Sequence, residues 1–273
     1  FYNDAREATT KKGNDYVSTL LEYRRLGFDL MVGRRLDSYF FLSANYRFEG
    51  DAGTFIDKTQ ETRNMLPMNN GQSGRSYVSS LTFSASRDSR NDLWLPTSGT
   101  MFNLSVKLSS KIFGSSYDYA KFTLEGEILL PTFKGHSWKL KLFGGIIQGD
   151  APFFERFYLG DYFYFSYVKP TLPRVWEINV TGLIAYNTVA VSGGMEYAIP
   201  VIKEPVGGLY RGFVYAAILA SGTSSVSEII YGKTSTADSI SPVSFDLGMK
   251  LDTSVGVFTI SVAYWTNLLL MLR

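Results

Sequence analysis

Long segments of this chain alternate between apolar and polar side chains. In residues 102–109, apolar side chains occupy every second position and polar side chains occupy the positions between them. The same pattern recurs, with few interruptions, in residues 121–130 and 243–252. A repeat of two residues is typical of a β-strand, whose successive side chains point to opposite faces of a sheet. The alternation therefore predicts antiparallel strands with one apolar face and one polar face.

The length of the alternating segments distinguishes two architectures that share this pattern. Strands of a soluble β-sandwich usually run for about five or six residues, whereas a tilted strand that crosses a membrane needs roughly 9–11. Residues 121–130 and 243–252 alternate over the longer distance. Charged side chains such as Lys107, Glu125 and Asp246 also stand in mid-segment, which suits a hydrated interior. We therefore predict an all-β fold, an antiparallel transmembrane β-barrel whose apolar face meets lipid.

Eleven segments have the pattern of such strands. They are residues 17–24, 28–35, 39–49, 77–88, 100–110, 119–131, 138–148, 189–200, 209–221, 243–253 and 256–264. Single-chain bacterial barrels contain an even number of strands, so we expect 12 to 16. Residues 268–273 would supply a twelfth strand, and 16 are expected if strands precede residue 1. Residues 1–273 then form one barrel domain, with short turns at one end and long loops, including an extracellular-type loop at 150–188, at the other.

Composition argues against several other classes of protein. No uninterrupted apolar run reaches the roughly 18 residues of a transmembrane helix. The chain has no cysteine, which excludes disulfide bonds and thiolate metal sites. The net charge is only +2 and the basic residues are scattered, whereas nucleic-acid binding needs a concentrated basic face. We therefore expect no nucleic-acid partner.

The sequence also lacks the usual motifs of catalysis. His136 is the only histidine, which argues against a metal site or a catalytic triad. There is no G-x-S-x-G elbow, P-loop or dinucleotide fingerprint. Glu125 and Glu127 share a strand face and could form an acid–base pair, but neighbouring lysines favour their interpretation as solvated lumenal charges. We expect no catalytic, cofactor-binding or metal-binding residues, and no enzymatic activity.

The string RDSRNDLWLPTSGT, followed by the strand MFNLSVKLSS, resembles a motif of the BamA superfamily of outer-membrane barrels, R-D-x-R-D-x-x-F-P-T-x-G. The residues that carry the resemblance are Arg87, Asp88, Asn91, Pro96, Thr97 and Gly99. The physical interpretation agrees with the resemblance, because proline and glycine bracket a tight turn whose amides Asp88 and Asn91 can bind.

Later landmarks of the superfamily follow in the expected order, so that the resemblance spans residues 27–264. PFFERFYLGD resembles the P-F-x-E-x-F-Y-x-G-G that opens the long extracellular loop of the family. Its marked residues here are Phe154, Glu155, Tyr158 and Gly160. GGMEYAIPV resembles the strand after that loop, and FDLGMKLDTSVGVFTISVAY resembles the penultimate hairpin. The aromatic segment 153–167 is too apolar for a solvated loop, so we expect it in the barrel mouth or lumen, or packed against a partner or lipid.

Two departures from the family pattern indicate a divergent member. The family usually carries V-R-G-[FY] in the long loop, with an arginine that pairs with acidic residues of the wall, whereas YFYFSYVKP here holds no arginine. The family's Asp-x-Gly strand reads FVYAAILASG, with Ala216 or Ala217 at the position of the aspartate. An unpaired charge in a confined lumen is costly, which explains why both are missing together. Glu196 remains as the candidate acidic residue of the lumen, with an ordinary wall carboxylate as the alternative.

The resemblance implies an outer-membrane barrel that inserts or translocates proteins. It implies contact with outer-membrane lipid, with client or accessory outer-membrane proteins, and with POTRA domains before residue 1. One alternative is a barrel that anchors an upstream patatin-like lipase, whose catalytic residues would lie outside this chain. Another is a passive pore. The client, the oligomeric state and lateral opening of the barrel are left open by the sequence.

Overall fold

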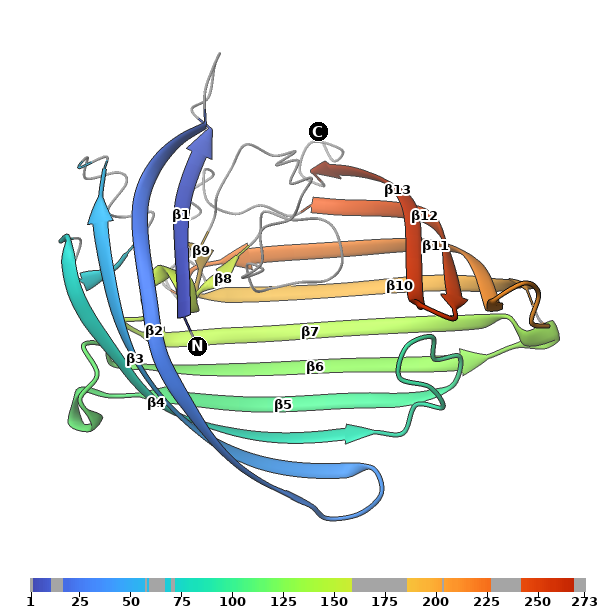
Figure 1. The fold of residues 1–273 in the computed structure, drawn as a ribbon, viewed down its shortest axis with the longest axis horizontal. Helices are drawn as coiled ribbons and strands as arrows, with labels where there is room; N and C mark the ends of the chain where they lie inside the picture. Colours follow the sequence, from blue (N-terminus) through green and yellow to red (C-terminus); the bar gives the residue numbers. More distant parts are fainter. Residues whose placement is uncertain are drawn as a thin grey trace.

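The computed structural model describes residues 2–10, 17–56, 58, 67–69, 72–158, 186–202, 204–226 and 242–267. Eleven antiparallel strands form one sheet in the order β1-β2-β3-β4-β5-β6-β7-β10-β11-β12-β13, so that each strand pairs with its neighbours along the chain (Figure 1). The strands are β1 (Tyr2–Thr10), β2 (Val17–Arg35), β3 (Phe40–Phe55), β4 (Gly74–Asp88), β5 (Gly99–Ser109), β6 (Tyr119–Pro131), β7 (Ser137–Gly149), β10 (Val189–Ile202), β11 (Leu209–Ser224), β12 (Pro242–Thr253) and β13 (Gly256–Asn267).

Short elements fill several connections between these strands. The two-stranded pair of β8 (Phe157–Tyr158) and β9 (Tyr186–Asn187) stands apart from the main sheet. Among the described residues, the single-turn 3₁₀ helices are η2 (Lys111–Phe113), η3 (Phe133–Gly135) and η4 (Phe153–Glu155). Within the described ranges, no helix has the length and apolar character needed to span a bilayer.

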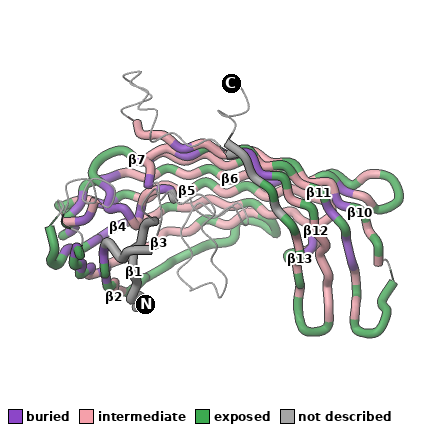
Figure 2. Tube along the Cα trace, turned by 90° about the horizontal axis from the view of Figure 1, so that it is seen from above, coloured by how far each residue is buried: buried purple, intermediate pink, exposed green. Residues whose placement is uncertain are grey.

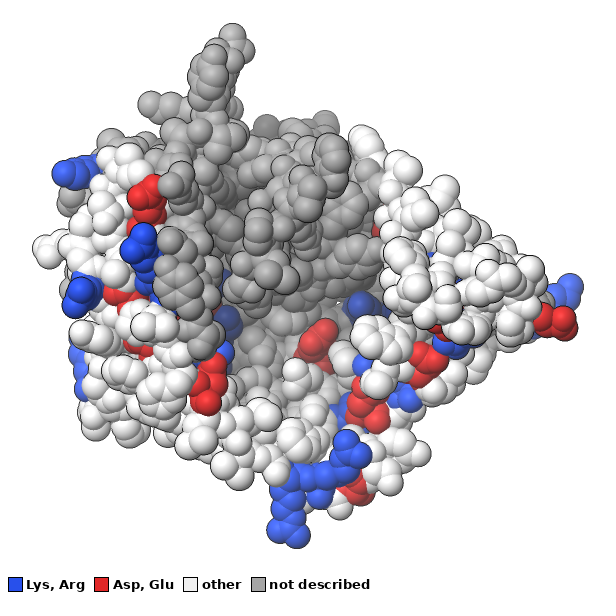
Figure 3. All heavy atoms as spheres, in the orientation of Figure 1, with Lys and Arg blue, Asp and Glu red and all other residues white. Residues whose placement is uncertain are grey.

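The sheet is strongly curved, and its two faces differ in chemistry. Seen from above, the strands form a bent wall (Figure 2). Large apolar side chains lie exposed on the convex face, including Leu26, Phe28, Leu30, Val32, Phe102, Leu104, Phe122, Leu124, Leu142, Leu247, Ile260 and Val262. Acidic and basic side chains are interspersed on the hollowed face of the molecule (Figure 3). The alternation in the sequence therefore separates an apolar outside from a polar inside, as predicted.

The antiparallel fold and most strand positions are confirmed, but the prediction was wrong at residues 17–35. The sequence pattern predicts two strands there, and the structure has the single 19-residue strand β2. Gly27 does not mark a turn. It faces β3, where a Cβ atom would lie 2.5 Å from the carbonyl oxygen of Phe48, so this glycine permits close approach of the neighbouring strand.

β1 was not predicted, and it replaces the strand lost by that merger, so the count of eleven remains. The described strands do not close into a ring, because β1 and β13 each pair on one side only. The expected twelfth strand at 268–273 falls outside the described residues. Short links at residues 36–38, 133–136 and 254–255 each join two adjacent strands of the sheet, in agreement with the short turns expected from the sequence.

The outer face of β2 changes character along its length. The outward side chains from Leu26 to Val32 are apolar, whereas Glu22 and Arg24 precede them on the same face. On the inner face, Leu21 and Tyr23 are buried with Phe55 of β3. The second half of β2 therefore has an apolar outer face, and its first half has an inner face that is buried against other residues.

Candidate functional site

The motif string RDSRNDLWLPTSGT forms the connection between β4 and β5, and we call residues 89–98 the motif turn. Asn91 closes the turn, because its Oδ1 accepts hydrogen bonds from the backbone N–H groups of Thr97 (3.0 Å) and Ser98 (3.1 Å). Its Nδ2 donates to Thr97 Oγ1. Asp88 accepts from the guanidinium of Arg90 at 2.7 Å. Short polar side chains that bind nearby amides are a common means of fixing a turn.

Gly99 ends the motif turn in a conformation that favours glycine. Its φ is +106°, and a Cβ atom would lie 2.4 Å from the backbone oxygen of Ser89. We predict that Gly99→Ala lowers the free energy of unfolding by about 2 kcal/mol, because the new methyl group adds strain and a clash. Denaturant unfolding in detergent measures the loss. The control is Gly126→Ala in β6, where a Cβ meets nothing within 4 Å and unfolding should change little.

The motif turn also contacts strands that lie far away in the sequence. Asp92 Oδ2 accepts a hydrogen bond of 2.7 Å from Arg211 of β11, 119 positions later, and the same guanidinium reaches Asp252 of β12 at 2.9 Å. Leu95 is buried against Phe213 and Tyr215. The motif turn therefore folds back over the concave face and links β4 and β5 to β11 and β12.

The sequence motif identified Asp88, Asn91, Pro96, Thr97 and Gly99 but not the residues that make these distant contacts. Asp92, Leu95 and Arg211 carried no signal, because nothing in a single sequence relates positions 92 and 211, whereas Arg90 matches the second arginine of the motif and was overlooked. Arg87 is exposed at the end of β4, and the structure assigns it no contact within the motif turn. Pro96 and Thr97 line a cavity beside the turn.

The start of the long loop, residues 151–158, packs onto the concave face, and we call it the loop root. Phe153 and Phe157 are almost completely buried. Phe153 contacts Tyr23 and Tyr186 edge to face, with ring centroids 5.2 Å apart in both cases. Phe157 packs against Phe143 of β7. Of the places expected for the aromatic segment, which were the barrel mouth or lumen, a partner or lipid, residues 153–157 occupy the inner face of the wall, while 159–167 lie outside the described residues.

Glu155 is the charged residue of the loop root, and lysines of the wall surround it. Its Oε1 accepts a hydrogen bond of 2.6 Å from Lys107 Nζ of β5, and its backbone oxygen accepts one of 2.7 Å from Lys121 Nζ of β6. Arg25 Nη2 lies 4.0 Å from the same carboxylate. Burial by itself would raise the pKa of Glu155, but the positive charges of Lys107 and Lys121 outweigh it and lower the pKa to about 2.

This lowered pKa predicts a pH dependence of the loop root. The folded-state pKa of about 2 lies below the ordinary value of 4.5, so the stabilising contribution of Glu155 is complete above about pH 4.5 and is lost as pH falls toward 2. We expect the difference in unfolding free energy between the wild type and Glu155→Gln to shrink across this window. Urea unfolding at a series of pH values measures it, and a difference that stays constant would contradict the assignment.

A second charged cluster lies beside the loop root. Arg25 Nη2 donates to Glu49 Oε1 at 2.6 Å, and its Nε lies 3.3 Å from Asp51 Oδ1. The ring of Phe154 covers the guanidinium, whose Cζ lies 4.1 Å from the ring centroid. Arg25 is therefore held between two wall carboxylates and an aromatic residue of the loop root.

The remaining site residues of the sequence analysis lie in different places. Glu196 of β10 forms an ion pair with Lys250 of β12, beyond the intervening β11. Ala217 is its register partner on β11, so the alternative position Ala216 points to the other face. The side chain of Tyr158 and all of Gly160 lie outside the described residues. The functional role assigned to each of these residues stays a prediction.

The described residues hold no cluster suited to a metal ion, and the only histidine has a local role. They contain no group of three or more histidine and acidic residues placed to hold a metal ion. His136 Nδ1 lies 2.7 Å from Tyr197 Oη, and its ring contacts Phe133. His136 therefore stabilises the turn between β6 and β7.

An antiparallel wall with an apolar convex face, a charged concave face and an inserted loop root defines a transmembrane β-barrel. The family model of the Omp85 superfamily domain matches residues 1–267, and this chain belongs to the Omp85 superfamily. That match confirms the resemblance seen in the motifs.

One solved structure supports the same fold. The structure of BamA from Haemophilus ducreyi lacking POTRA domains 1–3 matches with a TM-score of 0.67 and 14% identity, over 90% of this chain and 52% of that chain. This chain thus spans about half the length of that BamA, and the likeness shows the fold alone. The structure of LpxR from Salmonella typhimurium matches over 90% of this chain and 82% of that chain, with 9% identity. Its TM-score is 0.31, so this match does not support a shared fold. No curated protein matches the sequence significantly.

Proposed function

We propose that this chain is the outer-membrane barrel of a machine that inserts or translocates other proteins. The observation that carries the proposal is the match to the Omp85 superfamily over residues 1–267, on a curved wall whose outside is apolar and whose inside is charged. The apolar convex face suits direct contact with outer-membrane lipid. The charged concave face suits the passage or retention of polar polypeptide.

The proposed client is itself a β-strand of an outer-membrane protein. In hydrocarbon every backbone polar group needs a hydrogen-bond partner, so an unfolded client strand gains from pairing with another strand while it enters the membrane. Accessory outer-membrane proteins and periplasmic domains before residue 1 belong to the same proposal.

Reconstitution of the complete protein tests this function. The protein is placed in phospholipid liposomes and given a urea-unfolded outer-membrane β-barrel as client, and the protease-protected, folded client is measured over time. We expect folding several times faster than in empty liposomes. Equal rates with and without the protein, for several barrel clients, would contradict the proposal.

A barrel that anchors an upstream patatin-like lipase is the second candidate. The departure from the family's loop motif is the reason to consider a divergent branch, because YFYFSYVKP stands where the family usually carries V-R-G-[FY]. The coding sequence before residue 1 decides between the two. A G-x-S-x-G motif there, with lipase activity of the complete protein, would favour the anchor, and POTRA domains without that motif would favour the assembly barrel.

A further inference from the structure

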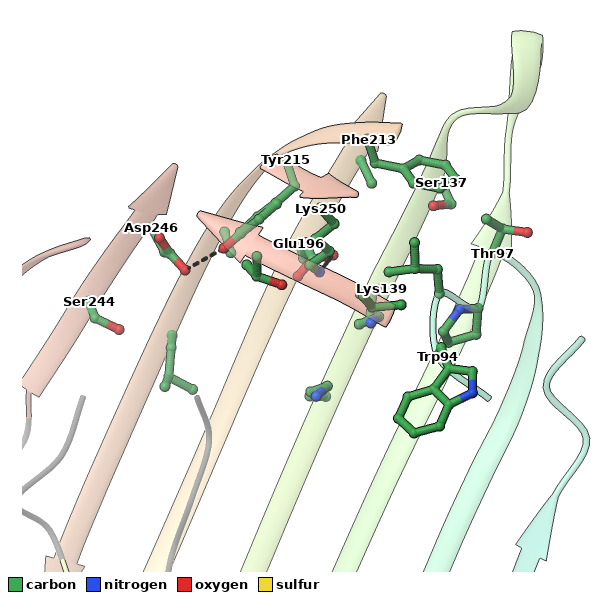
Figure 4. A pocket seen from close by; sticks show the side chains of 18 residues that line it. Trp94, Thr97, Ser137, Lys139, Glu196, Phe213, Tyr215, Ser244, Asp246 and Lys250 are labelled. Atoms are coloured by element: carbon green, nitrogen blue, oxygen red, sulfur yellow. Dashed lines mark hydrogen bonds and ion pairs between the residues drawn. The ribbon is translucent and has the colours of Figure 1, made fainter. Parts of the chain in front are cut away.

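A cavity of about 230 Å³ lies between the motif turn and the concave face of the sheet. Figure 4 shows Trp94 and Thr97 of the motif turn on one side of it, and side chains of β7, β10, β11 and β12 on the other. No contact described above uses this space. Its size is below the range of about 300–1,000 Å³ typical of pockets for drug-sized ligands, so it suits one small group.

Three ammonium groups line this cavity, and two of them are already paired. Lys250 forms its ion pair with Glu196, and Lys141 Nζ lies 3.3 Å from Glu127 Oε2. Lys139 of β7 lies opposite Glu196 in the register with β10, but within the part of the chain that the structure describes it forms no ion pair of its own, because Glu196 pairs with Lys250. A partly buried cation without a direct ion pair is stabilised when an anion joins it.

The rest of the lining is mainly apolar and aromatic. Leu95 comes from the motif turn, Phe213 and Tyr215 from β11, and Val257 from β13. Leu95, Phe213 and Tyr215 are buried against one another. The indole of Trp94 also lines the cavity and is largely exposed. A ligand in this space therefore has one end beside an ammonium group and the other against apolar side chains.

We propose that this cavity binds a carboxylate attached to an apolar group, with Lys139 as its ion-pair partner. One ammonium without a direct ion pair suits one added negative charge, which must lie beside Lys139 and away from Asp246, a lining carboxylate that accepts a hydrogen bond from Tyr215. A dianionic phosphate would bring a second charge toward Glu196 and Asp246, which also line the cavity. The same chemistry is offered by a small free acid and by the C-terminal residue of a peptide. The site goes beyond the proposed function, because it can exist whether or not the barrel inserts proteins.

Ligand binding to the complete purified protein in detergent tests the proposal. The probes are 3-phenylpropionate and N-acetylphenylalanine, each with its uncharged amide as matched control, followed by calorimetry and tryptophan fluorescence. We expect saturable binding of an acid, at least about tenfold weaker binding of its amide, and loss of the fluorescence change in Trp94→Phe. Binding of N-acetylphenylalanine alone would support a peptide terminus, and binding of both acids would support apolar acids in general.

Lys139→Met removes the charge and should weaken acid binding about tenfold to a hundredfold, the usual range for a hydrogen bond to a charged group. Lys134→Met, in the exposed turn at η3, should bind like the wild type. Removal of an unpaired cation should not lower the thermal stability of the protein, and Lys139→Gln provides a second variant that keeps a polar group. Equal affinity for acid and amide, unchanged binding in Lys139→Met, or displacement of the acid by inorganic phosphate would overturn the proposal.

Discussion

Replacing Glu155 with alanine is expected to lower the free energy of unfolding by about 3–5 kcal/mol, the usual cost of removing one partner from a buried ion pair. The change leaves the ammonium group of Lys107 without its carboxylate and takes a negative charge from the vicinity of Lys121 and Arg25. Because β5 then loses its link to the loop root, and β6 keeps only the hydrogen bond from Lys121 to the backbone oxygen of residue 155, cleavage of the loop by added protease should also become faster. Guanidinium unfolding in detergent and limited proteolysis measure the two effects.

A double mutant separates the ion pair from a general loss of packing. Lys107→Met alone should also destabilise, because it leaves Glu155 with less positive charge around it. If the pair accounts for the effect, Glu155→Gln combined with Lys107→Met should cost clearly less than the sum of the two single changes. Strict additivity would show that the 2.6 Å contact contributes little.

Replacing Phe153 with alanine should have an effect of similar size, about 3–5 kcal/mol, through a different cause. Its side chain is 0% exposed and fills the space between Tyr23 of β2 and Tyr186 of β9. Truncation removes buried apolar area and leaves a cavity that rigid strands cannot close. The temperature at which the folded band disappears in unboiled gel electrophoresis should fall.

The adjacent Phe154 provides the matched control. It lies in the same 3₁₀ turn, is only partly buried and mainly covers Arg25. Phe154→Ala should therefore cost distinctly less than Phe153→Ala. Equal losses would show that the loop root is not fixed by the buried aromatic contact, and the assignment of Phe153 as its main apolar residue would be wrong.

Local patterns in the sequence were sufficient for much of the fold. Alternation identified strands such as β5, β6 and β12, because the face of the sheet to which a side chain points depends only on its position along its own strand. It failed at β2, where Gly27 looks like a turn residue and instead permits close approach of Phe48 and Glu49. The distinction depends on the neighbouring strand, which a single sequence does not show.

The same contrast applies to the site. The hydrogen bonds of Asn91 and the backbone of Gly99 act within the motif turn, so their residue types were informative. The pairs Asp92 with Arg211 and Glu196 with Lys250 depend on the curvature and register of the whole sheet. Glu155 was found through the family motif, but its cationic partners were not, since Lys107, Lys121 and Arg25 lie on three different strands and form no linear pattern.

The change of character along β2 locates the edge of the lipid layer. A tilted strand needs only roughly 9–11 residues to cross the hydrocarbon, whereas β2 has 19. The apolar outer face from Leu26 to Val32 lies against the acyl chains, and the portion of the strand near Glu22 extends beyond them into water. Leu21 and Tyr23, which hold Phe153, lie on that raised portion. The loop root therefore packs against a part of β2 whose outer face meets solvent, and its stability should not depend on the thickness of the surrounding bilayer.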